Sequence, residues 1–213
     1  MPGFSFDCAG VAPERYAAAP TMVFSLKIGE DSGVRVHSMS LHCQLRIEPQ
    51  RRGYTPADAE RLADLFGEPS RWGETLKPMQ FANVALTVRG FAGSTVVDMP
   101  VPCTYDFDVA AAKYLHALRD GEIPMLLLFS GTAFYQGESG MQIDQIPWDR
   151  EISVRVPVAV WRDMMDLAFP NQGWIRMRTD TLDALQLFKS TRALTTWDET
   201  LALLLRSAAE PPR

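Results

Sequence analysis

The chain has 213 residues, of which 46% are hydrophobic and 22% charged, and its formal net charge is −5. This apolar content supports a full core and argues against disorder, while the mixing of acids and bases argues against nucleic acid or an anionic membrane as the main partner. The N-terminal segment lacks a basic stretch followed by a long apolar run, no apolar run is long enough to cross a bilayer, and three cysteines are too few for a disulfide framework. We therefore expect a cytoplasmic protein with no membrane insertion and no nucleic-acid partner.

The N-terminal part of the chain alternates between apolar and polar residues, which is the period of a β-strand. This alternation predicts strands at residues 4–8, 21–30 and 35–48, and it is strict from Met39 to Glu48. One dry and one wet face are typical of an antiparallel sheet, because parallel strands are usually apolar throughout. The sequence Asp31-Ser32-Gly33 predicts a hairpin turn between the second and third strands.

A helix interrupts the strands at residues 56–66. Thr55 is suited to cap it, Pro56 suits the first helical position, and Gly67 suits its C-terminal end. Strands resume at Met79, and the apolar phase slips near Ala82-Asn83, which predicts a β-bulge.

The middle of the chain predicts four further strand segments and one short helix. Residues 96–107 contain Pro100 and Pro102, which suits an edge strand. The other segments are a helix at 109–118, an apolar central strand at 123–129, and a final pair of strands at 141–146 and 151–156.

After Pro157 the apolar period becomes helical. We expect three helices: one over 158–168, one capped by Asp180, and one that starts at a capping box of Thr196 and Glu199. Trp161 and Trp197 lie on the apolar stripes and are predicted to be in the core, whereas Trp72, Trp148 and Trp174 lie in loops, where they either close the ends of the fold or form exposed anchors.

These elements predict a mainly β, α+β fold: an antiparallel β-sandwich, immunoglobulin-like in outline, over residues 1–156. The helix at 56–66 is inserted into it, and residues 157–207 are expected to form a helical cap that packs on the sandwich as part of one structural unit. A closed barrel with a ligand cavity is the alternative.

The residues that carry chemistry do not form a recognisable catalytic or metal site. His42 and Cys43 are neighbours on a strand and so face opposite sides, and no paired cysteine or histidine spacing suits a metal. Ser130 follows the central strand without a nucleophile motif, and the acidic pairs Asp106 with Asp108 and Asp144 with Asp149 have no defined pocket. We therefore predict no catalytic residue, no metal and no cofactor.

The densest group of arginine and aromatic residues lies around the inserted helix. Arginine, tyrosine and tryptophan are favoured in protein interfaces, which makes this group a candidate partner-binding surface. The alternative is a solvated loop whose arginines pair with Glu48, Glu68 and Glu74. The candidate residues are Arg46, Arg51, Arg52, Tyr54, Arg71 and Trp72.

Several longer segments together resemble a bacterial family of unknown function. The segments are RIEPQRRGY, LFGEPSRWGETLKPMQFANV, VPCTYDFDVAAAKYLHALRDGEIPMLLLFSGTAF and VPVAVWRDMMDLAFPNQGWIRM, followed by TLDAL and TTWDETL. Genes of that family often lie beside those of high-affinity uptake [NiFe] hydrogenases, so the resemblance implies a helper role in hydrogenase assembly or electron handling. This chain lacks the cysteine sets that would hold an iron–sulfur cluster or nickel.

Three functions follow as hypotheses. The first is a non-enzymatic accessory or adaptor protein that binds another protein, either a hydrogenase subunit or a maturation factor. The second is a small-molecule binding module with a cavity between the sheets and the C-terminal helices. The third, which the residues favour least, is a hydrolase built on Ser130 or the acidic pairs.

Overall fold

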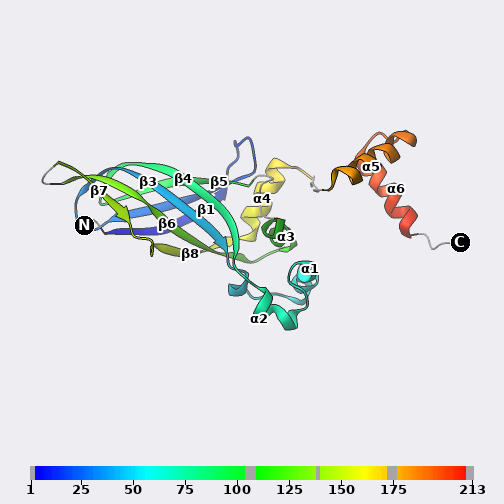
Figure 1. Cartoon of the computed structure of the whole chain (residues 1–213), viewed down its shortest axis with the longest axis horizontal. Coiled ribbons are helices and arrows are strands. Elements are labelled where there is room, and N and C mark those ends of the chain that lie inside the picture. The colour runs from blue at the N-terminus through cyan, green and yellow to red at the C-terminus, as the bar shows by residue number, and fades with distance from the viewer. Residues whose placement is uncertain (1–2, 104–108, 138–139, 172–176, 210–213) are drawn as a thin grey trace. The chain divides into compact units, whose positions relative to one another are not determined.

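The fold is α+β, with two antiparallel sheets of three and five strands (Figure 1). The computed structural model describes residues 3–103, 109–137, 140–171 and 177–209. The strands in these ranges are β1 (Phe4–Pro13), β2 (Thr21–Glu30), β3 (Arg35–Ile47), β4 (Met79–Ala92), β5 (Ser94–Pro102), β6 (Glu122–Gly137), β7 (Gly140–Ile146) and β8 (Glu151–Pro157).

Six α-helices occur in the described ranges, and three of them are C-terminal. They are α1 (Pro56–Phe66), α2 (Trp72–Thr75), α3 (Val109–Ala117), α4 (Val158–Ala168), α5 (Thr179–Thr191) and α6 (Trp197–Ala209), with short 3-10 helices η1 (Pro49–Arg51) and η2 (Pro69–Arg71). The chain divides into two compact units, Met1–Asn171 and Gln172–Arg213.

The strands of the first unit form two separate sheets, not the single closed sheet of the barrel alternative. The smaller sheet has the order β1-β2-β5, and the larger has the order β4-β3-β6-β7, with β8 also paired to β6. Strands β7 and β8, predicted as a final pair, are not hydrogen-bonded to each other in the registers described. Both strands pair with β6, β7 along residues 131–137 and β8 along residues 122–128.

The strictly alternating strand β3 behaves as its sequence predicts. Its apolar residues are buried in the core, and the residues between them face the opposite side of the sheet, where several are exposed. Buried residues from both sheets belong to one hydrophobic cluster, in which the ring of Phe6 from β1 stacks on Phe129 from β6 with centroids 4.3 Å apart. The buried set on β3 is Val36, Met39, Leu41, Cys43, Leu45 and Ile47.

The predicted hairpin at Asp31-Ser32-Gly33 is wrong. Strand β2 lies in the three-stranded sheet and β3 in the five-stranded sheet, so the turn crosses from one sheet to the other. A second crossing, from β4 to β5, lies beside it, since the Glu30 amide donates to the Gly93 carbonyl at 2.6 Å. Strand β3 pairs with β4 and β6 and not with β2. Apolar alternation predicts which face of a strand is buried, but it does not predict which strand lies beside it.

Two local predictions for the strands are confirmed. The β3–β4 register shifts so that Phe81 is an extra residue between the pairs Leu45–Ala82 and Arg46–Gln80, which is the expected bulge. Strand β5, with its prolines, pairs with β2 and lies at the end of the sheet order, as an edge strand.

The helices of the first unit gather at one end of the two sheets (Figure 1). Helix α1 has the expected bounds and capping box, in which the Asp58 amide donates to the Thr55 hydroxyl and the Thr55 amide to the Asp58 carboxylate. Helix α4 contacts β1, β2 and β8, and its buried residues are Val158, Trp161 and Met164. The prediction for Trp161 is therefore confirmed, while the expected loop position of Trp174 lies outside the described residues.

The second unit contains α5 and α6. The capping box of α6 is present, because Glu199 accepts from the Thr196 amide and the Glu199 amide donates to the Thr196 hydroxyl. The expected cap at Asp180 is wrong by two residues, since Arg178 precedes the helix and Asp180 lies in its first turn. Trp197 is 38% exposed, contrary to its predicted core position. Packing of residues 157–207 on the sandwich as one unit stays a prediction.

Candidate functional site

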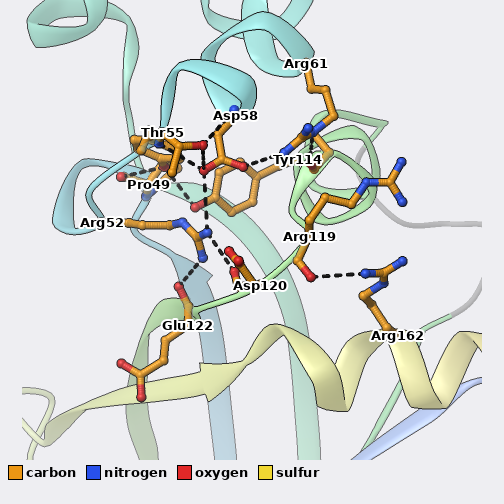
Figure 2. A network of polar contacts seen from close by, with 12 residues as sticks. Pro49, Arg52, Thr55, Asp58, Arg61, Tyr114, Arg119, Asp120, Glu122 and Arg162 are labelled. Carbon is orange, nitrogen blue, oxygen red and sulfur yellow. Dashed lines mark hydrogen bonds and ion pairs between the residues drawn. The ribbon is translucent and has the colours of Figure 1, made fainter.

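The segment after β3, helix α1, helix α3 and the chain that enters β6 meet in a cluster of polar side chains around two buried groups, the Arg52 guanidinium and the Asp58 carboxylate; we call it the Arg52–Asp58 cluster (Figure 2). The Arg52 side chain is only 8% exposed, and its Nη1 and Nη2 donate to the carbonyl oxygens of Glu122 and Asp120 at 2.7 and 2.8 Å. Its Nη2 is also 4.0 Å from a carboxylate oxygen of Asp58. Arg52 therefore fastens the segment after β3 to the chain that enters β6. The cluster consists of Arg52, Tyr54, Thr55, Asp58, Arg61 and Tyr114.

The Asp58 carboxylate is the buried anion of the cluster. It accepts hydrogen bonds from the Thr55 amide and hydroxyl at 3.1 and 2.9 Å and from Arg61 Nη2 at 2.7 Å. Burial by itself favours the neutral acid, but these hydrogen bonds and the Arg52 charge outweigh it, so the pKa of Asp58 lies below its ordinary value. A buried carboxylate with this many donors stays ionised and acts as a fixed structural charge.

The aromatic members of the cluster are also held internally. The Tyr54 hydroxyl donates to the Pro49 carbonyl at 2.8 Å and lies 2.9 Å from the Tyr114 hydroxyl, which therefore donates to it. Burial is the main cause that raises the pKa of Tyr54. The Trp72 ring packs edge-on to Tyr54 with centroids 5.0 Å apart, and its Nε1 donates to the Gly67 carbonyl.

The predicted partner-binding residues thus fall into two groups. Four of them, Arg46, Arg52, Tyr54 and Trp72, are half-buried and make contacts within the fold, whereas Arg51 and Arg71 are exposed. Arg51 pairs with Glu48 at 3.0 Å, which is a pair that the solvated-loop alternative names, but the Glu48 carboxylate is buried; Arg51 Nη1 also donates to the Ser153 hydroxyl at 3.1 Å. The partner-binding role itself stays a prediction. The sequence shows these residues as one group because it cannot distinguish a buried arginine from an exposed one.

The side of the five-stranded sheet that faces away from the core, which we call the outer face, carries two of these arginines. Strand pairing places Arg46 of β3 beside Gln80 of β4 and Leu126 of β6, and Leu126 beside Ser153 of β8. The contact between Ser153 and Arg51 extends this row to the loop after β3. Arg46 therefore lies within one continuous row across the sheet, and Arg51 lies at the end of that row, beside Ser153.

A depression of about 540 Å³ lies on the outer face beside this row. Trp148, from the loop between β7 and β8, is one of its walls and is 88% exposed. The polar side chains that line it carry amide, imidazole and hydroxyl groups, and no carboxylate or arginine is among the described lining residues. The lining residues with side chains on this face include His42, Gln44, Asn83, Leu128, Ser130 and Trp148.

Strand pairing brings His42 opposite Ser130, a juxtaposition that sequence reasoning missed. Directly opposed residues on neighbouring strands have their Cβ atoms within about 5 Å, so an imidazole lies beside the hydroxyl. The depression offers no carboxylate among its described residues to orient the imidazole as a base. Close packing explains the glycine at position 131, because a Cβ atom there would lie 2.1 Å from the Ser40 carbonyl oxygen. These contacts favour a structural role for Ser130-Gly131.

Cys43 is buried on the inner side of β3 and His42 is exposed on the outer side, which confirms their predicted separation. Burial raises the pKa of Cys43 to about 12 and that of Cys103 to about 12, so both thiols stay protonated and unreactive near neutral pH. Within the described ranges no group of three or more histidine, cysteine, aspartate or glutamate residues is placed to hold a metal ion.

The predicted acidic pairs do not form a site in the described residues. Asp144 accepts a hydrogen bond from the Tyr135 hydroxyl at 2.7 Å, and Asp149 lies 4.0 Å from Arg150. Asp106 and Asp108 lie outside the described residues. None of the helices that the structure describes has the length and apolar character of a membrane span.

Comparisons with known proteins place the chain in a family. Among solved structures, it is similar to an ApaA protein from Bordetella pertussis, with 10% identity over 73% of this chain and 94% of that chain and a TM-score of 0.26. It is also similar to β-glucosidase 3B from Thermotoga neapolitana in complex with α-D-glucose, with 10% identity over 73% of this chain and 17% of that chain and a TM-score of 0.24. No curated protein gives a significant match. A family model matches residues 1–213 over their full length, and the chain therefore belongs to DUF6084, a family of unknown function.

Proposed function

We propose that this protein is a non-enzymatic accessory protein that binds another protein through the outer face of its five-stranded sheet. The observation that carries the proposal is Trp148, a large aromatic side chain that is 88% exposed beside a depression on that face. Tryptophan and arginine are over-represented among the residues that dominate binding energy in protein interfaces.

The neighbourhood of Trp148 suits such an interface. Leu126 and Leu128 are half-buried in the middle of the face, and Arg46 and Arg51 lie on the row beside it. An apolar centre with arginine and amide groups around it is the usual composition of a protein-binding patch. Arg46 and Arg51 can also make paired hydrogen bonds to carboxylates, so we expect a partner with acidic groups at its contact surface.

The family resemblance in the sequence segments suggests where to look for the partner. We propose that the first candidate partners are a hydrogenase subunit and a hydrogenase maturation factor, and that binding takes place in the cytoplasm. The protein would act on assembly or electron handling without holding a metal or cofactor of its own.

The experiment is affinity recovery of partners from the native host with the tagged full-length chain. Trp148→Ala and Arg46→Ala should each lower recovery of the specific partner while the far-ultraviolet circular dichroism spectrum stays unchanged. The matched control is Tyr16→Ala, which removes another exposed aromatic side chain, 95% exposed, from the β1–β2 connection. If Trp148→Ala and Tyr16→Ala recover the partner equally well, the outer face is not the binding surface.

A second candidate is a small-molecule binding module, and the depression on the outer face favours it. Its lining combines an exposed indole with neutral hydrogen-bonding groups on His42, Asn83 and Ser130. Such a set suits a neutral, polar ligand. Ligand-observed nuclear magnetic resonance with a fragment library would test it: hits that compete with one another and vanish in Asn83→Ala would support the module, and hits that persist in that variant would count against it.

We further propose that the two sheets form a β-sandwich with an immunoglobulin-like outline. The strand orders β1-β2-β5 and β4-β3-β6-β7 support this, because they correspond to strands A, B and E on one side and C′, C, F and G on the other. The stacking of Phe6 on Phe129 between the sheets also supports it. An experimental structure of the full chain would test the outline.

A further inference from the structure

The depression on the outer face holds polar groups that the rest of the fold does not use. The side chains of His42 and Ser130 are exposed and lie opposite each other on β3 and β6. In the part of the chain that the structure describes, neither of these side chains makes a hydrogen bond, and the side-chain nitrogen of Asn83 makes none. These three groups are therefore available to a ligand that enters the depression.

The amide of Asn83 is held in place by a chain of side-chain hydrogen bonds across β3 and β4. Gln80 Nε2 donates to Asn83 Oδ1 at 3.3 Å, and Gln44 Nε2 donates to Gln80 Oε1 at 2.7 Å. Arg46 Nη2 donates in turn to Gln44 Oε1 at 2.9 Å. The carbonyl oxygen of Asn83 is thus occupied, and its NH2 group remains as a donor. A ligand meets a donor that is already oriented, which lowers the entropy cost of binding.

The charges around the depression favour a neutral ligand. Its described lining residues include no carboxylate, lysine or arginine. The nearest arginine on the row beside it, Arg46, already donates to Gln44, and Glu151 is exposed beside Leu128 on β8. A phosphate or carboxylate would therefore find no cation in the lining and a like charge close by, and a cationic ligand would find no carboxylate in the lining.

The exposed indole of Trp148 narrows the class of neutral ligand. The face of an aromatic ring is negative and attracts the weakly positive C–H groups of a saturated ring. Asn83 lies opposite Gln44, so His42 is its diagonal neighbour, and such neighbours are about 7–8 Å apart. Saccharides combine a flat C–H surface with hydroxyl groups spread around it. Each hydroxyl both donates and accepts, so it can pair with an amide N–H or with an imidazole.

We propose that the depression is a binding site for a neutral saccharide, in which a sugar ring stacks on Trp148 and its hydroxyl groups bond to Asn83 and His42. This inference rests on the second candidate function, the small-molecule binding module, and names the class of its ligand. The volume of about 540 Å³ lies within the range of roughly 300–1,000 Å³ that is usual for ligand pockets. The site opens to solvent at the exposed indole, so it suits a short oligosaccharide as well as a single ring.

The test is a titration of the isotope-labelled full-length chain followed by two-dimensional nuclear magnetic resonance. The neutral probes are maltotriose, cellotriose, xylotriose and diacetylchitobiose. Trigalacturonate is the anionic counterpart, and adenosine is a neutral ligand with an aromatic ring. At least one neutral oligosaccharide should shift the indole N–H resonance of Trp148, whereas trigalacturonate and adenosine should not.

Three variants assign the binding to the depression. Trp148→Ala should weaken binding of that oligosaccharide about tenfold or more, because the stacking surface is lost. Asn83→Ala should weaken it about fivefold, which corresponds to the loss of one hydrogen bond. The matched control, Tyr16→Ala, removes an aromatic side chain that is 95% exposed elsewhere and should leave the affinity unchanged. The rest of each spectrum shows whether the variant stays folded.

Several outcomes would overturn the proposal. If no oligosaccharide binds while fragments bind in a way that depends on Asn83, the ligand belongs to another class and the small-molecule module stands. If neither oligosaccharides nor fragments bind, the module fails as well. Equal binding to the wild type, Trp148→Ala and Asn83→Ala would place the saccharide on another surface. Equal shifts with trigalacturonate or adenosine would contradict selection of a neutral sugar ring.

Discussion

The Arg52–Asp58 cluster and the outer face of the five-stranded sheet are built from the same kinds of residue but differ in their partners. In the cluster, arginine donates to the backbone of neighbouring segments and to a buried carboxylate, and the aromatic hydroxyls bond to each other. On the outer face, Trp148 projects into solvent, and Arg51 pairs with Glu48 and Ser153 while half of its side chain stays exposed. Composition therefore does not separate a structural arginine from one available to a partner. The two kinds of arginine are distinguished by burial of the side chain and by the acceptor to which each N–H group donates.

The largest expected effect tests the separation of the two faces of β3. Cys43→Asp places an unpaired charge in the core and should lower the free energy of unfolding by about 4 kcal/mol or more. His42→Asn, one residue away on the outer face, should change it by less than about 0.5 kcal/mol. Urea denaturation of both variants measures the difference, and similar midpoints would show that the strand register is wrong.

The next largest effect tests the charge balance of the cluster. Asp58→Asn removes the anion that compensates Arg52 and Arg61, and breaking a buried ion pair from one side should cost about 3 kcal/mol. Asp64→Asn, in the same helix, removes an exposed ion pair with Lys113 and should cost less than about 1 kcal/mol. Equal losses in chemical denaturation would mean that the buried carboxylate is no more important than a surface one.

Two neighbouring arginines sharpen the comparison directly. Arg52→Ala leaves the carbonyls of Asp120 and Glu122 without their donor and should lower the free energy of unfolding by about 2 kcal/mol. Arg51→Ala should cost less, about 1 kcal/mol, because the Arg51 side chain is half exposed although its partner Glu48 is buried. In the partner-recovery experiment the larger effect should come from Arg51→Ala, which should recover less partner than the wild type and than Arg52→Ala. A stable Arg52→Ala that loses the partner would assign Arg52 to the interface instead.

The smallest effect is a pH dependence of stability. The folded state lowers the pKa of Asp58, so its contribution is complete above the unfolded value of about 3.9 and is lost as the pH falls from there towards the folded pKa. The stability difference between wild type and Asp58→Asn should therefore narrow below about pH 4. Denaturation midpoints of the two proteins across that range provide the measurement, and a constant difference would contradict an ionised Asp58.

Much of the fold could be predicted because it depends on short-range patterns. The alternation in β3, the bulge at Phe81, the bounds of α1 and the capping boxes of α1 and α6 all follow from residues that are neighbours in the chain. The candidate site could be predicted only as a region. Arg52 and Tyr54 are close in the chain, but the groups that they contact, the carbonyls of Asp120 and Glu122 and the hydroxyl of Tyr114, come from a segment 60 to 70 residues away.

The sequence by itself determined the main strands and helices, the apolar face of β3, and where α1 and α6 begin. Tertiary structure decided which strands are neighbours: β2 and β3 lie in different sheets despite the turn between them, and His42 meets Ser130 only through pairing of β3 with β6. The physical reason is that a period of two specifies a side of the strand, while the choice of partner depends on how all apolar faces are covered at once. The same limit applies to the arginines, because the energy of a guanidinium depends on the carbonyls and carboxylates that distant segments bring to it.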